Sequence, residues 1–399
     1  MTEGAAPEEL GARRARLVEG VAGVALAVAA AALAFLIGGL VVVATGHDPF
    51  AAYKAIFDGS GFNWFFPWVQ GRARTTAAFN LQQTLLVVTP LILTALAVAF
   101  AFRCGLFNIG GQGQYTAGLI AAVLVGTRLI DLNRPLHILL AVFAALAAGF
   151  VWAGIAGFLR ATAGAHEVIT TIMLNWIAIY GGQYLFEQGG PFQGSEPSLP
   201  RSDPVAATAQ IWPIWGPAGF QALHAGIFIA LFALVVYHLL LNRTTLGYEV
   251  RAVGFNPDAA AYGGISVRRN YFLALAIAGS FAGLAGAMDI LGWQYQVATN
   301  DIQVGTVGFI GIAVALLGRN NAVGILFAAL LFASLQVGTS SRNLDPTVFP
   351  PELAGNLATM IQALIILFVA AEVLVLYLWG TRRHIGFTGL PRVRPELEK

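Results

Sequence analysis

The side chains that could carry out catalysis are few in this sequence, and their spacing matches none of the common mechanisms. The phosphate-binding loop of ATPases needs Gly-Lys followed by Ser or Thr, but neither Lys54 nor Lys399 follows a glycine. His166 and Glu167 begin a zinc-protease pattern, yet Thr170 stands where its second histidine belongs. No Gly-x-Ser-x-Gly elbow occurs, and the 6 histidines lack metal-ligand spacing. We therefore expect no enzyme, no cofactor and no metal site.

Polar side chains inside long apolar stretches are a second source of chemistry, since such groups need a partner or a function. They are Glu167, Asn175, Asp289, Gln336, Gln362 and Glu372. Glu167 and Asp289 fall near the ends of their stretches, so we expect both carboxylates to reach water, whereas Glu372 lies deeper. A proton-driven carrier needs several central carboxylates, which argues against a secondary transporter.

The composition indicates that a bilayer is the solvent of this fold. The 399 residues are 57% hydrophobic and 11% charged, whereas a soluble protein carries roughly a quarter charged residues. A spanning helix needs ~20 apolar residues, and the chain offers about ten such runs. The net charge of +2 gives no basis for binding nucleic acid. We therefore predict an all-α polytopic membrane protein in contact with lipid.

Ten spanning helices are expected, and this even number places both termini on one side. Their ranges are roughly 18–45, 81–102, 112–128, 136–159, 168–187, 222–241, 271–291, 305–318, 322–338 and 354–379. Of the 22 lysines and arginines, 15 then fall on the side of the termini and 7 on the other. Because basic residues favour the cytoplasmic side, we predict cytoplasmic termini and a cytoplasmic 242–270 loop.

This topology divides the chain into three parts. We expect residues 1–17 to be a cytoplasmic tail, 18–380 a transmembrane domain and 381–399 a second cytoplasmic tail. Two outer segments are long: 47–80 is amphipathic and aromatic, and 188–221 reads as an ordered loop with little regular structure. Each could receive an external partner or serve as an interfacial anchor.

A polar island, LGYEVRAVGFNPDAAAYGGIS at 246–266, interrupts the apolar pattern. Asn256 can cap a helix, Pro257 suits its first position, and Asp258 complements its positive end. Gly263–Gly264 would end it. Such a short helix has little core of its own to bury. It suits either a knob that enters a groove of another protein or an ordinary loop.

Glycine-rich stretches mark two further places. In FRCGLFNIGGQGQYTAG at 102–118, glycines lower helix propensity beside polar amides, which predicts either a broken helix at 105–114 facing a pathway or a tight inner turn. A second glycine-broken stretch at 292–311 hints at an internal repeat. The glycines of GSFAGLAGA at 279–287 predict close helix packing.

Five segments together resemble the membrane permeases of bacterial ATP-binding-cassette importers, over roughly 80–390. They are GLFNIGGQGQ at 105–114, EVITTIMLNWIA at 167–178, GYEVRAVGFNPDAAAYGGI at 247–265, AGLAGA at 282–287 and GIAVALLGRNNAVGILFAALLF at 311–332. The branch that the chain most resembles is the nucleoside permeases, within the group that handles ribose, other simple sugars and branched-chain amino acids.

The resemblance implies alternating access in the inner membrane, driven by ATP on a separate cytoplasmic ATPase subunit. It also implies an external substrate-binding protein, often a lipoprotein, and a second permease subunit in a heterodimer. The coupling helix in the ATPase cleft would comprise Arg251, Gly254, Asn256, Pro257, Asp258, Ala259, Ala260 and Gly264.

For the substrate pathway, aromatic and amide side chains suit a nucleoside, which has an apolar base and a hydroxyl-rich sugar. We expect it to include Phe107, Asn108, Gln112, Gln114, Asn175, Trp176 and Tyr180. Trp176 and Tyr180 could instead face lipid or pack between helices. Three functions remain open: a nucleoside permease, a permease for ribose-like sugars or branched-chain amino acids, and a stand-alone secondary transporter.

Overall fold

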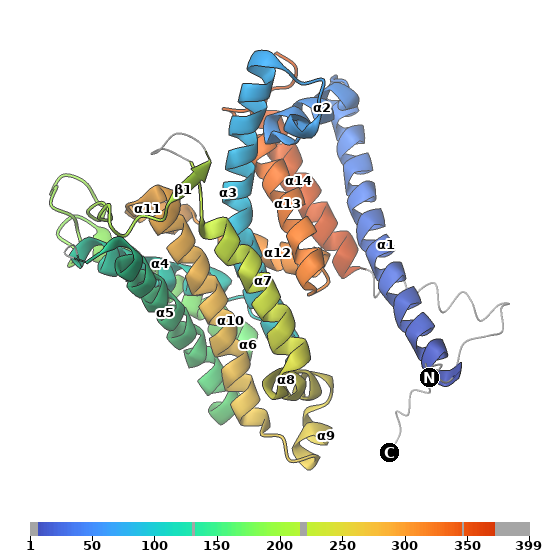
Figure 1. The fold of residues 1–399 in the computed structure, drawn as a ribbon, viewed down its shortest axis with the longest axis vertical. Coiled ribbons are helices and arrows are strands. Elements are labelled where there is room, and N and C mark those ends of the chain that lie inside the picture. The colour runs from blue at the N-terminus through green and yellow to red at the C-terminus, as the bar shows by residue number, and fades with distance from the viewer. Residues whose placement is uncertain (1–6, 130–131, 216–221, 345–346, 372–399) are drawn as a thin grey trace, which may run out of the picture.

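The computed structural model describes residues 7–129, 132–215, 222–344 and 347–371, and these residues are mostly helical (Figure 1). The first half contains α1 (Pro7–Ala44), α2 (Pro49–Ser60), a 3-10 turn (Phe62–Phe65), α3 (Gly71–Phe102), α4 (Gly111–Arg128), α5 (Arg134–Ala163) and α6 (Glu167–Phe186). The second half contains α7 (Gly226–Arg243), α8 (Thr245–Phe255), α9 (Pro257–Tyr262), α10 (Val267–Asp289), a π-helical turn (Ile290–Gln294), α11 (Thr299–Val304), α12 (Val307–Leu317), α13 (Ala322–Gly338) and α14 (Pro351–Ala370).

The strands in the described residues are a single short hairpin. β1 (Pro213–Trp215) pairs antiparallel with β2 (Leu223–His224). It lies between α6 and α7, where the sequence predicts a loop with little regular structure. Because β2 occupies the first residues of the predicted helix 222–241, α7 starts at Gly226 instead.

Each of the ten predicted spans coincides with a helix of the structure. Within the described residues, seven helical segments are long and apolar enough to cross a membrane; α13 is shorter, and α4 and α6 are not among the seven. α1 begins eleven residues earlier than predicted, because its polar first turns are helix-compatible, and its apolar part is Ala25–Ala44. The end of the last predicted helix, Glu372 and the tail 381–399 lie outside the described residues.

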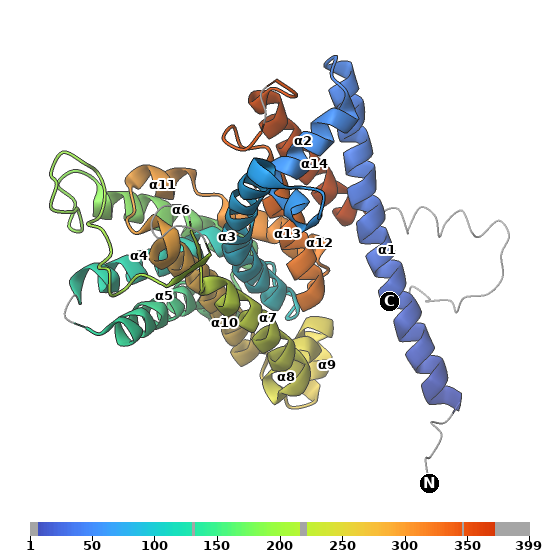
Figure 2. The ribbon, with the colours of Figure 1, turned by 45° about the horizontal axis from the view of Figure 1, so that its top comes forward.

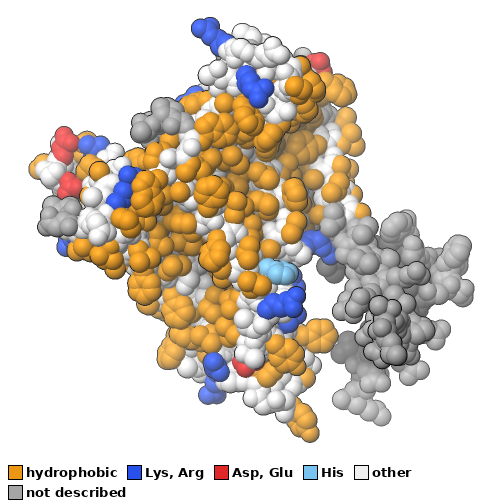
Figure 3. All heavy atoms as spheres, viewed as in Figure 1, with side chains coloured by type: hydrophobic (Ala, Val, Ile, Leu, Met, Phe, Trp, Pro, Cys, Tyr) orange, Lys and Arg blue, Asp and Glu red, His pale blue; other side chains and the backbone are white. Residues whose placement is uncertain are grey.

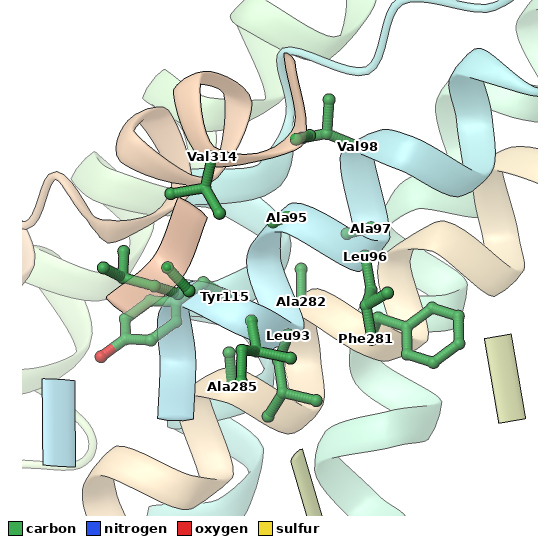
Figure 4. Packing of buried hydrophobic residues seen from close by; sticks show 14 of the residues in the cluster. Leu93, Ala95, Leu96, Ala97, Val98, Tyr115, Phe281, Ala282, Ala285 and Val314 are labelled. Carbon is green, nitrogen blue, oxygen red and sulfur yellow. The ribbon is translucent and has the colours of Figure 1, made fainter. Parts of the chain in front are cut away.

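The core forms around α3 and α10, which are the most deeply buried of the long helices. Leu93, Ala95, Leu96, Ala97 and Val98 of α3 are fully enclosed. In Figure 4 they meet Ala282 and Ala285 of α10, Tyr115 of α4 and Val314 of α12. The small side chains on α10 let its neighbours approach closely, which is the packing that membrane helices use in place of a hydrophobic driving force.

Glycines of α10 create the tightest of these approaches. A Cβ atom built on Gly279 would lie 2.1 Å from the Gly149 carbonyl oxygen of α5, and one on Gly283 would lie 2.3 Å from that of Ala145. No side chain fits there, so the predicted packing role of 279–287 is confirmed.

The two ends of the molecule differ in composition from its middle. The start of α1 lies at the same end as α8 and α9, while α2 lies at the opposite end (Figures 1 and 2). α1 packs on α14 and α2 at one edge. On the face shown in Figure 3, hydrophobic side chains cover the middle and most charged ones gather toward the ends. This distribution fits a multi-pass membrane protein.

Candidate functional site

The predicted helix break is present between α3 and α4. α3 ends at Phe102, the chain runs without helix through residues 103–110, and α4 starts at Gly111. Non-helical backbone inside a membrane protein leaves N–H and C=O groups without helix partners, and these must be satisfied by other protein groups. The amides that the sequence analysis singled out supply several of those partners.

Asn108 and Gln114 form a closed pair across the break. Nδ2 of Asn108 donates to Oε1 of Gln114 at 3.0 Å, and Nε2 of Gln114 donates to Oδ1 of Asn108 at 2.9 Å. The backbone N–H of Gly110 donates to the same Oδ1 at 3.0 Å. Both side chains are buried. Their polar groups are therefore spent on holding the break in shape.

Asn175 and Gln112 tie the break to two other helices. Oδ1 of Asn175, on α6, accepts from Gly113 N at 2.7 Å, and its Nδ2 donates to Ile109 O at 2.9 Å. Oε1 of Gln112 accepts from Gly308 N of α12 at 2.9 Å. A Cβ on Gly308 would lie 2.2 Å from Gln112 N. The two glycine-broken stretches thus meet in the fold.

A cavity of about 250 Å³ opens beside this junction. Its walls come from α3, α4, the end of α10 with the following π-helical turn, and α11, α12 and α13. The polar lining residues are Gln112, Tyr115, Thr116, Asp289, Trp293, Gln294, Asp301 and Gln336. The apolar ones are Leu86, Val87, Pro90, Leu91, Leu119, Ile302 and Val307. A mainly apolar hollow with a few convergent polar groups is typical of small-molecule sites.

Asp289 is the most deeply buried carboxylate of this cavity, with 3% of its surface exposed. The Tyr115 hydroxyl donates to its Oδ2 at 2.6 Å, and Trp293 Nε1 donates to its Oδ1 at 3.1 Å. Trp293 lies in the π-helical turn that begins at Ile290, and it is four residues after Asp289 on the same side of the helix. Such turns occur frequently at functional sites.

The expectation that Asp289 extends to the water at the end of its span is therefore wrong, because it is buried in the bundle and faces the cavity. The π-helical turn extends the buried helix beyond Asp289, so the carboxylate lies inside the bundle. Glu167 is also buried; its Oε2 lies 3.5 Å from Arg160 Nε. Sequence reasoning missed Tyr115, Trp293 and Gln294, although an ionisable group within a span was a sufficient signal to search around Asp289.

The other predicted pathway residues lie elsewhere. Of the seven, Gln112 is the one among the cavity's lining residues. Phe107 stacks on Phe102, with ring centroids 5.0 Å apart. Trp176 and Tyr180 stack on each other on the outside of α6 and are 51% and 64% exposed. The structure therefore brings the amides together but leaves these two aromatics on the surface.

The polar island folds as two short helices. The Thr244 hydroxyl caps α8 by accepting from Gly247 N at 3.1 Å. Asn256 caps α9, as the sequence predicts, because its Oδ1 accepts from Ala259 N at 3.0 Å and Pro257 occupies the first turn. Gly264, with φ of +83°, follows the helix in the left-handed region that favours glycine. α8 was not predicted.

The predicted coupling residues divide into inward and outward positions. Ala260 is buried, and a Cβ on Gly254 would lie 2.2 Å from the Arg103 carbonyl oxygen that follows α3. The other six are exposed: Arg251, Asn256, Pro257, Asp258, Ala259 and Gly264. Phe255 and Tyr262, which the sequence analysis did not select, are 94% and 98% exposed. Two exposed aromatic rings, one just before α9 and one at its last residue, therefore lie at this end of the molecule.

Comparison with known proteins places these features in context. Residues 80–370 match the family model for the branched-chain amino acid transport system permease component. A guanosine ABC transporter permease protein of Bacillus subtilis is 38% identical, over 88% of this chain and 93% of its own length. A nucleoside ABC transporter permease protein of Lactococcus lactis is 36% identical, over 86% and 89%. A glucose ABC transporter permease protein of Haloferax volcanii is 35% identical, over 84% of each chain.

Proposed function

The chain belongs to the branched-chain amino acid transport system permease family, and we propose that it carries nucleosides across the membrane. It is a permease subunit of an ATP-binding-cassette importer, a multi-pass membrane component and not an enzyme. Nucleosides are the proposed cargo because two long, similar relatives bear the names guanosine and nucleoside permease. The secondary-transporter alternative is set aside.

The exposed end of the α8–α9 segment is the observation that carries the energy-coupling part of the proposal. In it, Phe255 and Tyr262 are the aromatic anchors that enter a cleft of a cytoplasmic ATPase, with Arg251 beside them. Aromatic and arginine side chains are the usual energetic centres of protein interfaces. The ATPase acts only through its different affinities for the two states of the permease.

The remaining partners follow from the importer architecture. A second permease subunit completes a heterodimer, and an external substrate-binding lipoprotein delivers the cargo. The opposite end of the molecule, with α2 and the segment from Glu187 to Trp215, offers the docking face for that protein. The membrane is the bacterial inner membrane, with both termini and the α8–α9 segment inside the cell.

Replacing Phe255 and Tyr262 together by alanine tests the coupling. We expect uptake to fall at least about tenfold, as for the loss of an interface anchor worth roughly 2 kcal/mol, while membrane insertion and thermal stability stay unchanged. Phe143→Ala is the matched control, because Phe143 is 67% exposed on α5, outside both proposed docking surfaces. Normal uptake in the double variant would contradict the coupling role.

Gly254→Asp should also abolish uptake, because its side chain would force α8 away from the turn at Arg103.

Competition separates the proposed cargo from the second candidate, a sugar, which the similar glucose permease favours. Cells carrying the complete importer are given radiolabelled guanosine together with unlabelled adenosine, ribose, glucose or leucine. We expect adenosine to compete and the other three to be without effect. Uptake of labelled glucose but not guanosine would replace the nucleoside with a sugar.

A further inference from the structure

Hydrogen-bond acceptors make up most of the polar lining of this cavity, and its lining residues include no Lys, Arg or His. Each oxygen of the Asp289 carboxylate accepts one hydrogen bond from the protein, and a carboxylate oxygen can accept about two. Each therefore retains capacity for a further donor. Asp301 adds a second carboxylate to the same wall.

Gln294 supplies a further acceptor. Its Oε1 is buried and has no hydrogen-bond partner within the described part of the chain. Burying a polar atom without a partner costs free energy, so its presence on a cavity wall needs a reason. A ligand group that donates to Oε1 would supply one.

We propose that this cavity is an intramembrane binding site for neutral, hydroxyl-rich ligands, in which Asp289 and Gln294 accept their O–H or N–H groups. This inference rests on the proposed function, since a nucleoside carries ribose hydroxyls and base N–H groups. Trp293 and the apolar wall of α3 provide the surface against which a base or sugar ring lies.

The charges of the lining make the site selective. A ligand with a carboxylate or phosphate would bring a negative charge beside Asp289 and Asp301 with no basic side chain among the lining residues to compensate it. A desolvated, unpaired charge is expensive. The site therefore rejects nucleotides and the carboxylate end of an amino acid, although it accepts nucleosides and sugars.

The volume indicates a site that holds one small ligand. At about 250 Å³ the cavity is slightly below the ~300–1,000 Å³ of ordinary ligand pockets. It is thus large enough for a ribose with part of its base, and the ligand's remainder extends through the opening. Gln336, exposed at the end of α13, lies at the cavity wall.

Cysteine protection measures occupancy of this site at the cavity wall itself, rather than transport through the importer. Cys104 is the single cysteine and is buried, so Cys104→Ala with Gln336→Cys places one thiol at the wall. Membranes containing the whole importer are treated with N-ethylmaleimide and increasing guanosine, 2′,3′-dideoxyguanosine, guanosine monophosphate, ribose or leucine. Thr162→Cys in the same background, exposed in the last turn of α5, is the control for effects on the reagent itself.

We expect guanosine to slow labelling at Gln336→Cys and to leave Thr162→Cys unaffected. The dideoxy analogue should need a higher concentration for half protection, and the monophosphate and leucine should not protect. Adding Asp289→Asn should raise the guanosine concentration for half protection about tenfold or more. This is the effect expected when a hydrogen bond to a charged group is lost. The substitution should also remove the difference between guanosine and its dideoxy analogue.

The ratio of the half-protection concentrations of the dideoxy analogue and guanosine separates ligand binding by Asp289 from a purely structural role. If Asp289 only ties Tyr115 to the π-helical turn, Asp289→Asn lowers thermal stability but leaves the ratio between the two ligands unchanged, and the proposal is overturned. Protection by leucine or the monophosphate equal to that by guanosine overturns it too, as does absence of protection by every ligand. Protection by ribose without any guanosine uptake would retain the neutral-ligand site and reject the nucleoside function.

Discussion

At the scale of single residues, buried amide side chains satisfy the backbone groups around the helix break, which have no helical hydrogen-bond partners. Asn108, Gln112, Gln114 and Asn175 all satisfy one another or the backbone around the break. The sequence analysis assigned all four to the substrate pathway, which stays a prediction. The hydrogen bonds show them shaping the break, a role that suits amides because an amide side chain can both donate and accept.

The Asn108–Gln114 pair should behave as one unit. Asn108→Leu leaves the Gln114 amide buried without a partner, so we expect a loss of about 1–3 kcal/mol in stability. Adding Gln114→Met removes the orphaned group, and the double variant should unfold at a higher temperature than Asn108→Leu alone. Thermal unfolding in detergent measures both. Strictly additive losses would show that the pair is not coupled.

His224, the last residue of β2, should make the stability of the fold depend on pH. It is 1% exposed, Gly226 N donates to its Nδ1 at 3.1 Å, and burial lowers its pKa from 6.5 to about 4. The unfolded chain therefore binds a proton between pH 6.5 and 4 that the folded chain does not. The stability that neutral His224 provides is present above pH 6.5 and is lost as the pH falls.

We expect wild-type stability to fall by up to about 3 kcal/mol from this group between pH 7 and pH 4. His224→Gln, whose side-chain oxygen can still accept from Gly226, should show a shallower decline over the same range. Thermal unfolding at pH 7, 6 and 5 compares the two. Parallel curves would mean that His224 does not titrate as its burial predicts.

At the scale of elements, periodicity and caps were sufficient to predict most of the helices. Within the described residues each of the ten apolar runs contains a helix, and the Asn256-Pro257 cap places α9 within a residue. α8 was not predicted, because the charged residues in its sequence are also typical of a loop and the cap at Thr244 was not recognised. The π-helical turn at 290–294 also escaped, since residues of this kind continue an ordinary helix equally well.

The cavity could not be predicted, because it depends on which helices are neighbours. Asp289 and Tyr115 are 174 residues apart in sequence, and no local pattern indicates that α10 lies against α4. Trp176 and Tyr180 are the opposite case. Their types suit a nucleoside, but their positions on α6 place them on the surface, which the strongly apolar pattern of α6 did not reveal.

The α5–α10 contact gives a prediction at this scale. Gly279→Ala and Gly283→Ala place a methyl group against backbone carbonyls of α5, so we expect each to cost about 1–3 kcal/mol by overpacking. Gly181→Ala in α6 and Gly355→Ala in α14 are controls, because nothing lies within 4 Å of their added Cβ atoms. These two should be neutral or gain up to about 1 kcal/mol from helix propensity. Unfolding temperatures of all four in detergent decide the matter.

At the scale of the whole molecule, α10 runs from the proposed coupling segment, α8–α9, to the cavity. It starts beside α9, where Asn270 donates to Glu249 of α8 at 3.1 Å, and it ends at Asp289 in the cavity wall. Its 23 residues span roughly 33 Å at ~1.5 Å per residue. Because glycines lock it to α5, a displacement of α9 would move this pair as one rigid unit. Contact at one end can thus reshape the cavity at the other.

This arrangement requires the α8–α9 end to lie inside the cell, and cysteine labelling tests that directly. In the Cys104→Ala background, Asp258→Cys places a thiol on α9 and Ser198→Cys one near the opposite end, both at exposed positions. A membrane-impermeant maleimide should label Ser198→Cys in spheroplasts, and Asp258→Cys only after the membrane is opened. The unaltered chain, with Cys104 buried, should stay unlabelled in both. Labelling of Asp258→Cys in sealed spheroplasts would place α9 outside, where no ATP-hydrolysing subunit could reach it.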